Sequence, residues 1–337
     1  MSIIMTGGGT GGHLTIIKAV KEHFRDEELI YVGSTKGQDK QWFEVDNDFK
    51  EKYFFETRGV VNQGVFGKVK SLMMMAKAMF QSIKILRKHK ASVVFSVGGF
   101  SAAPMAFAAK LTKTPLVIHE QNAALGSLNK LLQPYATHFI SSYLDESSIK
   151  AYPVKQIFFD NARVRTEVKT IIFLGGSQGA KAINKLALQM APVLKEKGIN
   201  IIHQAGVNNI DEIKKSYEAL GIEAEVFGFT DRLADYMSEA DFAIARSGAS
   251  TLWELSATAV PTLYIPYPYA AKDHQYYNAQ FLVEKELAWL MRENSIEEEK
   301  IFDILDENME RKSKGLIQIV EKDGSIKIAQ LLKNMLK

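Results

Sequence analysis

Short apolar runs alternate with amphipathic helical patterns along the chain. In the first half, strands are expected at 2–5, 29–32, 93–97 and 115–119, and a helix at 14–24 follows the first strand. Short, mainly apolar runs with helical pattern between them are typical of parallel strands that helices cover on both faces. The first half therefore predicts an α/β domain with a parallel sheet.

The same order restarts after Pro153. A strand is expected at 170–174, a glycine turn at 175–179 and a helix at 180–196. Further strands are expected at 199–203, 224–227, 242–245 and 262–265. The second half thus predicts another α/β domain, which opens like the first with a strand, a glycine turn and a helix.

The length of the chain supports two domains. Its 337 residues exceed what one hydrophobic core usually serves, and 46% of them are hydrophobic, which is enough for two cores. We expect an N-terminal domain at 1–157 and a C-terminal domain at 158–324, facing each other across a cleft that holds the ligand. An amphipathic helix expected at 325–336 could pack back on the first domain.

Composition excludes several classes of site. The chain has no cysteine, so disulfides, thiolate metal sites and cysteine nucleophiles are ruled out. The N-terminus lacks the basic flank and long apolar run of a secretory signal, so a cytosolic protein is expected. The uncharged stretch 91–109 is nominally long enough to span a bilayer, but it contains Gly98, Gly99 and Pro104. We interpret it as a buried strand, a turn and the start of a helix.

Charge is segregated along the chain. The net charge is only +3, yet residues 57–119 contain ten Lys and Arg and no Asp or Glu. The rest of the chain is therefore net negative. Such segregation indicates an anionic partner for the first half, either nucleic acid or a phospholipid surface.

The glycine-rich segment 7–12 lies between the first strand and the first helix. It satisfies G-x-G-x-x-G, whose backbone N–H groups and helix N-terminus can hold an oxyanion. A nicotinamide cofactor would also need an acidic residue at the end of the second strand, which leads instead into Gly33 and Ser34. His13 closes the turn, and a neutral histidine at a helix N-terminus is a candidate general base, although a lone histidine is more often structural.

Three other polar segments follow expected strands. His119 to Asn122 crowds side chains that suit a hydroxyl-rich ligand. The turn at 175–179 is not a P-loop, because Gly179-Ala180-Lys181 breaks the required ending. In 246–254, Glu254 could accept both hydroxyls of a ribose, or it could cap the helix. No H-E-x-x-H pattern occurs, and no metal site is expected.

Taken together and in order, these motifs resemble those of the MurG family, bacterial glycosyltransferases that add N-acetylglucosamine to the lipid-linked muramyl-pentapeptide precursor of peptidoglycan. The resemblance covers nearly the whole chain. The matching segments are Gly8–His13, Val97–Phe100, His119–Ala123, Gly175–Ala180, Arg246–Ala249, and His274-Gln275 with Asn278-Ala279.

The resemblance implies a GT-B fold with two Rossmann-like domains and no cofactor. The implied reaction is an inverting transfer from UDP-GlcNAc to the C4 hydroxyl of undecaprenyl-diphospho-N-acetylmuramoyl-pentapeptide, which turns lipid I into lipid II. The implied role is peptidoglycan synthesis, and with it cell-wall biogenesis, cell shape and cell division. A UDP-GlcNAc epimerase with a similar two-domain plan is the alternative. An oxidoreductase or a nucleic-acid-binding module would leave the second-domain motifs unexplained, so no nucleic-acid partner is expected.

The resemblance also implies roles for individual residues. His13 is the expected catalytic base, with Glu120 as the second candidate. Gly9, Gly98 and Gly99 are expected near the acceptor diphosphate. The residues expected to bind UDP-GlcNAc are Thr10, Gly11, Gly12, Asn122, Arg165, Ser177, Thr230, Ala249, Thr251, Glu254, His274 and Gln275.

The sequence departs from the family pattern at three places. The family's Gly-Asn-Pro-Val-Arg linker is Asn161-Ala162-Arg163-Val164-Arg165 here, so only its last two residues match. Ile16 replaces a family proline after the loop histidine, and Phe100 replaces the tyrosine of the second loop. The role of Arg165 therefore has the weakest support.

The acid-free stretch also predicts a peripheral membrane patch. Apolar residues recur at helical spacing from Phe66 to Ile83, and several methionines make the helix apolar beyond one face. An ordinary buried helix with solvated lysines is the alternative. We expect attachment to anionic lipid at the cytoplasmic face of the cell membrane. The expected patch residues are Phe66, Lys68, Met75, Met79, Phe80 and Lys84.

Overall fold

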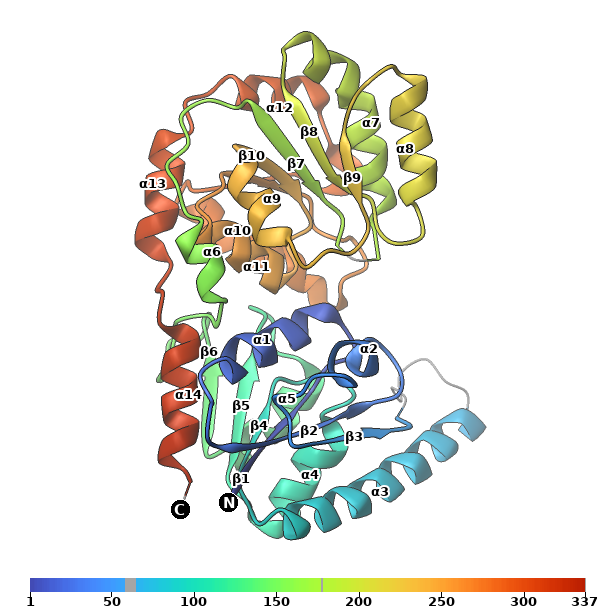
Figure 1. Ribbon diagram of the computed structural model, residues 1–337, viewed down its shortest axis with the longest axis vertical. Helices are drawn as coiled ribbons and strands as arrows, with labels where there is room; N and C mark the ends of the chain where they lie inside the picture. The colour runs from blue at the N-terminus through green and yellow to red at the C-terminus, as the bar shows by residue number, and fades with distance from the viewer. Residues whose placement is uncertain (58–64, 177, 337) are drawn as a thin grey trace. The chain divides into compact units, whose positions relative to one another are not determined.

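Two parallel sheets, each with its own hydrophobic core, organise the protein (Figure 1). The computed structural model describes residues 1–57, 65–176 and 178–336, and the side chains of 65–70 are outside this description. The chain divides into two compact units. The first unit is Met1–Val154 with Asp323–Lys337, and the second is Lys155–Lys322.

The first unit is built on a sheet with the strand order β3-β2-β1-β4-β5-β6, all parallel. Its strands are β1 Ser2–Thr6, β2 Glu28–Ser34, β3 Glu51–Phe55, β4 Ala91–Ser96, β5 Leu116–Glu120 and β6 His138–Ser141. Its helices are α1 Gly11–Lys21, α2 Asp39–Phe43, α3 Val65–Lys88, α4 Ala103–Thr112, α5 Ser127–Leu132, the 3₁₀ turn η1 Gln133–Tyr135, and α14 Gly324–Asn334.

The second unit repeats the plan with the strand order β12-β11-β10-β7-β8-β9. Its strands are β7 Thr170–Leu174, β8 Asn200–Gln204, β9 Glu225–Phe227, β10 Phe242–Ala245, β11 Thr262–Tyr264 and β12 Trp289–Leu290. Its helices are α6 Gln156–Asp160, α7 Lys181–Glu196, α8 Ile210–Ala219, α9 Leu233–Glu239, α10 Ala249–Ala257, α11 His274–Glu284, α12 Glu298–Leu305 and α13 Glu310–Ile319, with 3₁₀ turns η2 Ala271–Asp273 and η3 Glu293–Ser295.

Apolar burial on both faces explains why the central strands are visible in the sequence. All residues of β1 and β10 are buried, and in β7 only Thr170 is partly exposed. Three strands, β3, β6 and β12, are not among those that the sequence predicts. All three lie at the edges of their sheets, where short strands and charged residues are common. β3, for example, begins with Glu51 and Lys52, so it does not form an apolar run in the sequence.

The uncharged stretch 91–109 forms β4, a turn and most of α4, as the sequence indicated. Within the described part of the chain, no helix has the length and apolar character needed to cross a membrane.

The C-terminal helix α14 packs on α1 and belongs to the first unit (Figure 1). Ile328 and Leu332 are fully buried on one side of α14. His23 Nε2 lies 2.8 Å from Ser325 Oγ, and Lys333 pairs with Glu27 at 2.9 Å. Apolar burial therefore dominates this contact, since an exposed ion pair adds little.

Replacing Ile328 with Ala is expected to destabilise the first unit by about 2–4 kcal/mol, because it leaves a cavity under α14. Urea unfolding followed by circular dichroism measures the loss. Ile326→Ala is the matched control on the same helix, since Ile326 is 37% exposed. Equal losses for the two variants would contradict the described packing.

Candidate active site

The sequence motifs gather at the carboxyl ends of the two sheets. The glycine turn 7–9 follows β1, Gly98 and Gly99 follow β4, and the polar segment starting at His119 closes β5. In the second unit, the turn after β7 and the turn between β10 and α10 occupy the same edge. In parallel α/β sheets, ligands usually bind at the carboxyl ends of the strands.

The two glycine turns of the first unit pack against each other. Gly8 N–H donates to the Gly98 carbonyl at 3.3 Å, and a Cβ on Gly99 would overlap the Gly8 carbonyl oxygen. Gly7, Gly9, Gly98 and Gly99 all have φ between +80° and +129°. Larger residues would be strained here and would separate the turns.

Asp39, which sequence analysis did not single out, is bonded to the first glycine turn. Its Oδ1 accepts from Gly9 N–H at 2.5 Å and its Oδ2 from Ser34 N–H at 2.9 Å. That Gly9 helps to bind an acceptor diphosphate stays a prediction, and its N–H group donates to this carboxylate. Asp39 lies five residues beyond the strand end where an acidic residue was sought, in a charged segment that is easily taken for a solvated loop.

His13 is held on both sides of its ring at the start of α1. Its Nδ1 lies 3.0 Å from Thr10 Oγ1, and its Nε2 lies 3.0 Å from Gln121 Nε2. These two contacts fix the orientation of the ring, with Nε2 directed toward Gln121 and Nδ1 toward Thr10. His13 is therefore held in place at the start of α1.

His119 is fully buried near His13. Burial, with a smaller contribution from His13, lowers the pKa of His119 to about 3, so the ring is neutral. Neither ring nitrogen has a hydrogen-bond partner among the described residues. The ring packs edge-on against Tyr152 at a centroid distance of 5.6 Å.

Glu120 is engaged through both carboxylate oxygens. Oε1 accepts from Asn122 N–H at 3.0 Å, while Oε2 accepts from Gly126 N–H and Asn129 Nδ2, each at 2.9 Å. These bonds fold the loop that carries Asn122. A carboxylate used in this way is less suited to proton abstraction than His13, so the geometry favours His13 of the two base candidates.

The glycine turn of the second unit leads into the N-terminus of α7. Gly176 N–H donates to Gln204 Oε1 at 3.1 Å, and Gly179 N–H to the Gly176 carbonyl at 2.9 Å. Gly179 has φ +77°, and a Cβ there would overlap the Ala205 carbonyl. The turn is thus closely packed beside a helix N-terminus, which favours an anion. The expected site residue Ser177 lies outside the described residues.

Glu254 lies on the helix α10, behind Ala249 and Thr251. It is only 8% exposed, and burial raises the pKa of its carboxyl to about 7, with a smaller opposing effect from Lys155. The N-cap of α10 is Gly248 and has no side-chain cap, so Glu254 does not cap the helix. No donor among the described residues bonds the carboxylate. A buried carboxylate of this kind suits the hydroxyls of a ligand.

Arg165 occupies a different place from the one expected. It is 1% exposed, and its guanidinium donates only to backbone carbonyls. Nε and Nη2 bond the last turn of α9, and Nη1 bonds the Thr258 carbonyl at the end of α10. Nη1 also bonds the Arg163 carbonyl, which accounts for all five N–H groups. The expectation that Arg165 contacts the donor diphosphate is therefore wrong, because it joins two helix C-termini instead.

The remaining second-unit residues lie at loop ends. Gln275 Oε1 accepts from Tyr267 N–H at 2.9 Å, and His274 Nδ1 lies 3.0 Å from the Ala271 carbonyl. Lys272 and Asp273 precede them with φ of +55° and +53°, a strained conformation of the kind found at ligand sites. Thr230 Oγ1 accepts from Arg232 N–H at 3.0 Å.

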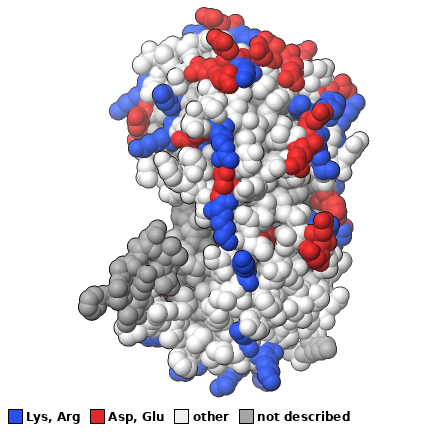
Figure 2. All heavy atoms as spheres, turned by 180° about the vertical axis from the view of Figure 1, so that it is seen from behind, with Lys and Arg blue, Asp and Glu red and all other residues white. Residues whose placement is uncertain are grey.

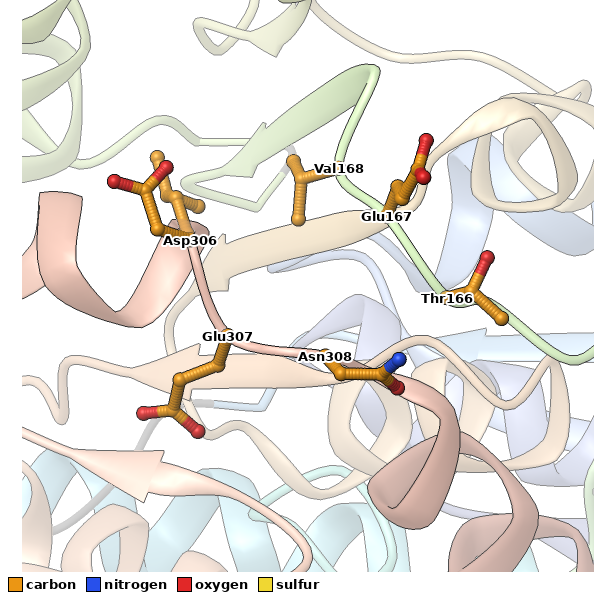
Figure 3. A pocket seen from close by; sticks show the side chains of 7 residues that line it. Thr166, Glu167, Val168, Asp306, Glu307 and Asn308 are labelled. Carbon is orange, nitrogen blue, oxygen red and sulfur yellow. The ribbon is translucent and has the colours of Figure 1, made fainter.

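A pocket of about 370 Å³ elsewhere in the second unit contains none of the expected site residues (Figure 3). Glu167, Asp306 and Glu307 are among its lining residues, and the carboxylates of Glu167 and Asp306 pair with Lys169 and Lys197.

One Asp-x-Asp sequence, which sequence analysis passed over, lies at Asp46-Asn47-Asp48. Both of its carboxylates contact Lys21 Nζ. The described part of the chain holds no group of three His, Asp or Glu side chains placed to bind a metal ion.

The expected membrane patch lies on α3, but with different exposed residues. Phe80 is 63% exposed and Lys84 is exposed, whereas Met75 and Met79 are partly buried. Met79 packs against the core of the first unit. The side chains of Phe66 and Lys68 lie outside the described residues. The exposed apolar side chains on the described part of α3 are Leu72, Met73 and Phe80.

The chain matches the models of the glycosyltransferase family 28 N-terminal domain over residues 3–141 and C-terminal domain over residues 170–332. It is 73% identical, over the whole of both chains, to the UDP-N-acetylglucosamine--N-acetylmuramyl-(pentapeptide) pyrophosphoryl-undecaprenol N-acetylglucosamine transferase of Sulfurovum sp. strain NBC37-1.

Solved structures share the fold. The crystal structure of Acinetobacter baumannii MurG is 25% identical, with a TM-score of 0.77 and 99% of each chain covered. A putative UDP-N-acetylglucosamine 2-epimerase from Listeria monocytogenes is 11% identical, with a TM-score of 0.64 over 99% of this chain and 96% of the other, and shares the fold alone. The expected two-domain GT-B fold is confirmed.

Glu254 is expected to make the stability of the second unit depend on pH. The pKa of the Glu254 carboxyl is higher in the folded state, about 7, than the ordinary value of 4.5, because burial disfavours the charged form. The free energy of unfolding is therefore highest below about pH 4.5, where the carboxyl is protonated in both states. It decreases as the pH rises toward about 7, because the folded state then loses its advantage of holding the proton. Relative to Glu254→Gln, the wild type is expected to lose roughly 2–3 kcal/mol between pH 5 and 8.

Urea unfolding at the two pH values measures this difference. In a Trp42→Phe background, both remaining tryptophans, Trp253 and Trp289, report on the second unit. A difference between wild type and Glu254→Gln that does not change with pH would contradict the described environment of the carboxyl.

Proposed function

The chain belongs to the MurG family of glycosyltransferases, and we propose from this membership and from its site that it makes lipid II. It transfers N-acetylglucosamine, with inversion, from UDP-GlcNAc to the C4 hydroxyl of undecaprenyl-diphospho-N-acetylmuramoyl-pentapeptide. The reaction is a step of peptidoglycan synthesis. The observation that carries the proposal is the buried Glu254 carboxylate, which lies on α10 without a donor among the described residues.

The second unit supplies most of the donor site in this proposal. The Glu254 carboxylate accepts the ribose hydroxyls, and backbone groups near Thr230 meet the uracil. Ser177 and the N-terminus of α7 hold the diphosphate, as a helix dipole favours. Ala249 and Thr251 line the same turn, and Asn122, His274 and Gln275 meet the sugar.

The first unit supplies the acceptor site and the base. Gly98 and Gly99 lie near the acceptor diphosphate, while Thr10, Gly11 and Gly12 reach the donor. Of Gly98 and Gly99, Gly99 is better suited to donate its N–H to a phosphate. No described residue accepts from Gly99 N–H, whereas Gly98 N–H lies 3.4 Å from Ser96 Oγ.

The proposed chemistry is a single displacement. The acceptor C4 oxygen bonds to the anomeric carbon of GlcNAc as the bond from that carbon to the UDP oxygen breaks. His13 Nε2 takes the hydroxyl proton once Gln121 releases that nitrogen. Negative charge develops on the departing diphosphate, where the N-terminus of α7 and the glycine turn stabilise it.

Incubation with labelled UDP-GlcNAc and a soluble lipid-linked muramyl-pentapeptide tests the proposal. We expect a labelled disaccharide and UDP release that depends on the acceptor. Release of UDP without an acceptor, with no disaccharide, would favour the epimerase alternative instead.

His13→Ala is expected to lower kcat by roughly 10²–10⁴-fold while leaving the KM for UDP-GlcNAc nearly unchanged, because the base acts in the transition state. Steady-state kinetics of disaccharide formation measure both constants. His138→Ala, on β6 and outside the proposed site, is the control. Turnover by His13→Ala close to that of the control would remove His13 from the mechanism.

The proposed location is the membrane surface at its cytoplasmic face. Leu72, Met73 and Phe80 expose apolar side chains on α3, and Lys77, Lys84 and Arg87 are exposed on the same helix. Figure 2 shows Lys and Arg gathered at the lower end of the first unit, with no Asp or Glu visible among them. Apolar insertion together with nearby lysines fits an anionic lipid surface.

Sedimentation with liposomes is expected to show binding that needs anionic lipid and weakens as salt rises. The triple variant Leu72→Ser, Met73→Ser and Phe80→Ser is expected to lose most of this binding. A control variant with Leu220→Ser, exposed in the second unit, should bind as the wild type does. Equal binding to neutral vesicles, or none to either kind, would contradict this location.

A further inference from the structure

The Asp39 carboxylate joins two neighbouring connections at the carboxyl edge of the first sheet. It accepts from Gly9 N–H after β1 and from Ser34 N–H at the end of β2. The Ser101 hydroxyl after β4 lies near the carboxylate, but Ser101 Oγ makes no hydrogen bond to a described residue. The strands β2 and β1 are adjacent in the sheet. One buried side chain therefore holds together the turns that follow these two strands.

Glycines leave the space that this carboxylate occupies. A Cβ on Gly8 or on Gly33 would overlap the Asp39 carboxylate, and a Cβ on Gly37 would overlap the backbone of Gly9. The glycine turn is thus shaped around Asp39 as well as around a ligand. This gives a structural reason for glycines at positions that need no contact with substrate.

The environment of Asp39 excludes direct contact with substrate. Its exposed fraction is 0%, and burial raises the pKa of its carboxyl, opposed by the N–H groups of Gly9 and Ser34 and the hydroxyls of Ser101 and Tyr31. Charge-assisted bonds to backbone N–H groups are among the stronger hydrogen bonds in proteins. Such a group fixes the backbone around it.

The fixed backbone leads directly to the proposed base. The helix α1 begins two residues after Gly9, and His13 is bonded to Thr10 within the same turn. A displacement of the turn would move His13 and the N-terminus of α1 together. Misplacement of a reacting group by about 1 Å can cost on the order of 10²-fold in rate.

We propose that Asp39 is a positioning residue for the transfer reaction, acting through the first glycine turn on His13 and on the start of α1. This inference rests on the proposed function. In this proposal Asp39 does not contact the substrate. Gly9 belongs to the part of the turn that the protein holds through Asp39, and the residues from Thr10 onward belong to the part that faces the ligand.

Asp39→Asn tests the proposal, because the amide keeps the size of the side chain but can accept from only one of the two N–H groups. We expect kcat to fall by roughly 10- to 100-fold, while the Kd of UDP, measured by calorimetry, stays within about twofold of wild type. UDP is the probe because the contacts proposed for its ribose, uracil and diphosphate are in the second unit. Glu44→Gln, an exposed carboxylate at the end of the same helix α2, is the matched control.

Asp39→Glu keeps the charge but adds a methylene group to a space that Gly8 and Gly33 leave for the shorter side chain. It is therefore expected to displace the turn and lower kcat by about tenfold or more, with the Kd of UDP nearly unchanged. Wild-type kinetics in Asp39→Asn would overturn the proposal. If Asp39→Asn fails to fold, Asp39→Glu decides alone: a roughly tenfold or larger loss of kcat with the Kd of UDP unchanged supports the proposal, and kcat within about threefold of wild type overturns it. Absence of turnover by the wild type would instead contradict the proposed function, so the two failures are distinguishable.

Discussion

Buried backbone groups at strand and helix ends need partners, and in this protein two buried charged side chains provide them. Asp39 accepts from backbone N–H groups at the carboxyl edge of the first sheet, and Arg165 donates to backbone carbonyls at the ends of α9 and α10. Each charge is compensated almost entirely by the backbone. The first glycine turn, His13 and Glu254 lie on elements that these two side chains hold in place.

The centre of each sheet and the order of its motifs could be predicted from the sequence. Strands such as β1, β7 and β10 are covered on both faces and so read as apolar runs. The edge strand β3 could not be recognised, because one side of it lacks a neighbouring strand and its first residues are charged. A hydrophobic pattern indicates which residues are buried, and fewer residues are buried in this edge strand than in the central strands.

Side-chain roles were less predictable than positions. Arg165 and Asp39 are both charged, and sequence alone gives no sign that either is buried or that its partners are backbone atoms. The motif match placed Arg165 at a phosphate, whereas its five N–H groups are used by carbonyls. Asp39 stands in a charged segment with no periodic pattern. The roles of both residues depend on contacts with segments that are distant in the sequence. The residues next to them in the chain give no indication of these contacts.

The two units divide the proposed reaction between them. The glycine turn of the first unit carries the base and the acceptor residues, and that of the second, with α10, carries the nucleotide site. Hydrogen exchange measured by mass spectrometry on the full chain, with and without UDP, tests this division most directly. The account predicts slower exchange at 174–180, 227–232 and 246–254 when UDP is bound. Protection confined to the acidic pocket at 166–168 and 305–308, or to the first glycine turn, would contradict it.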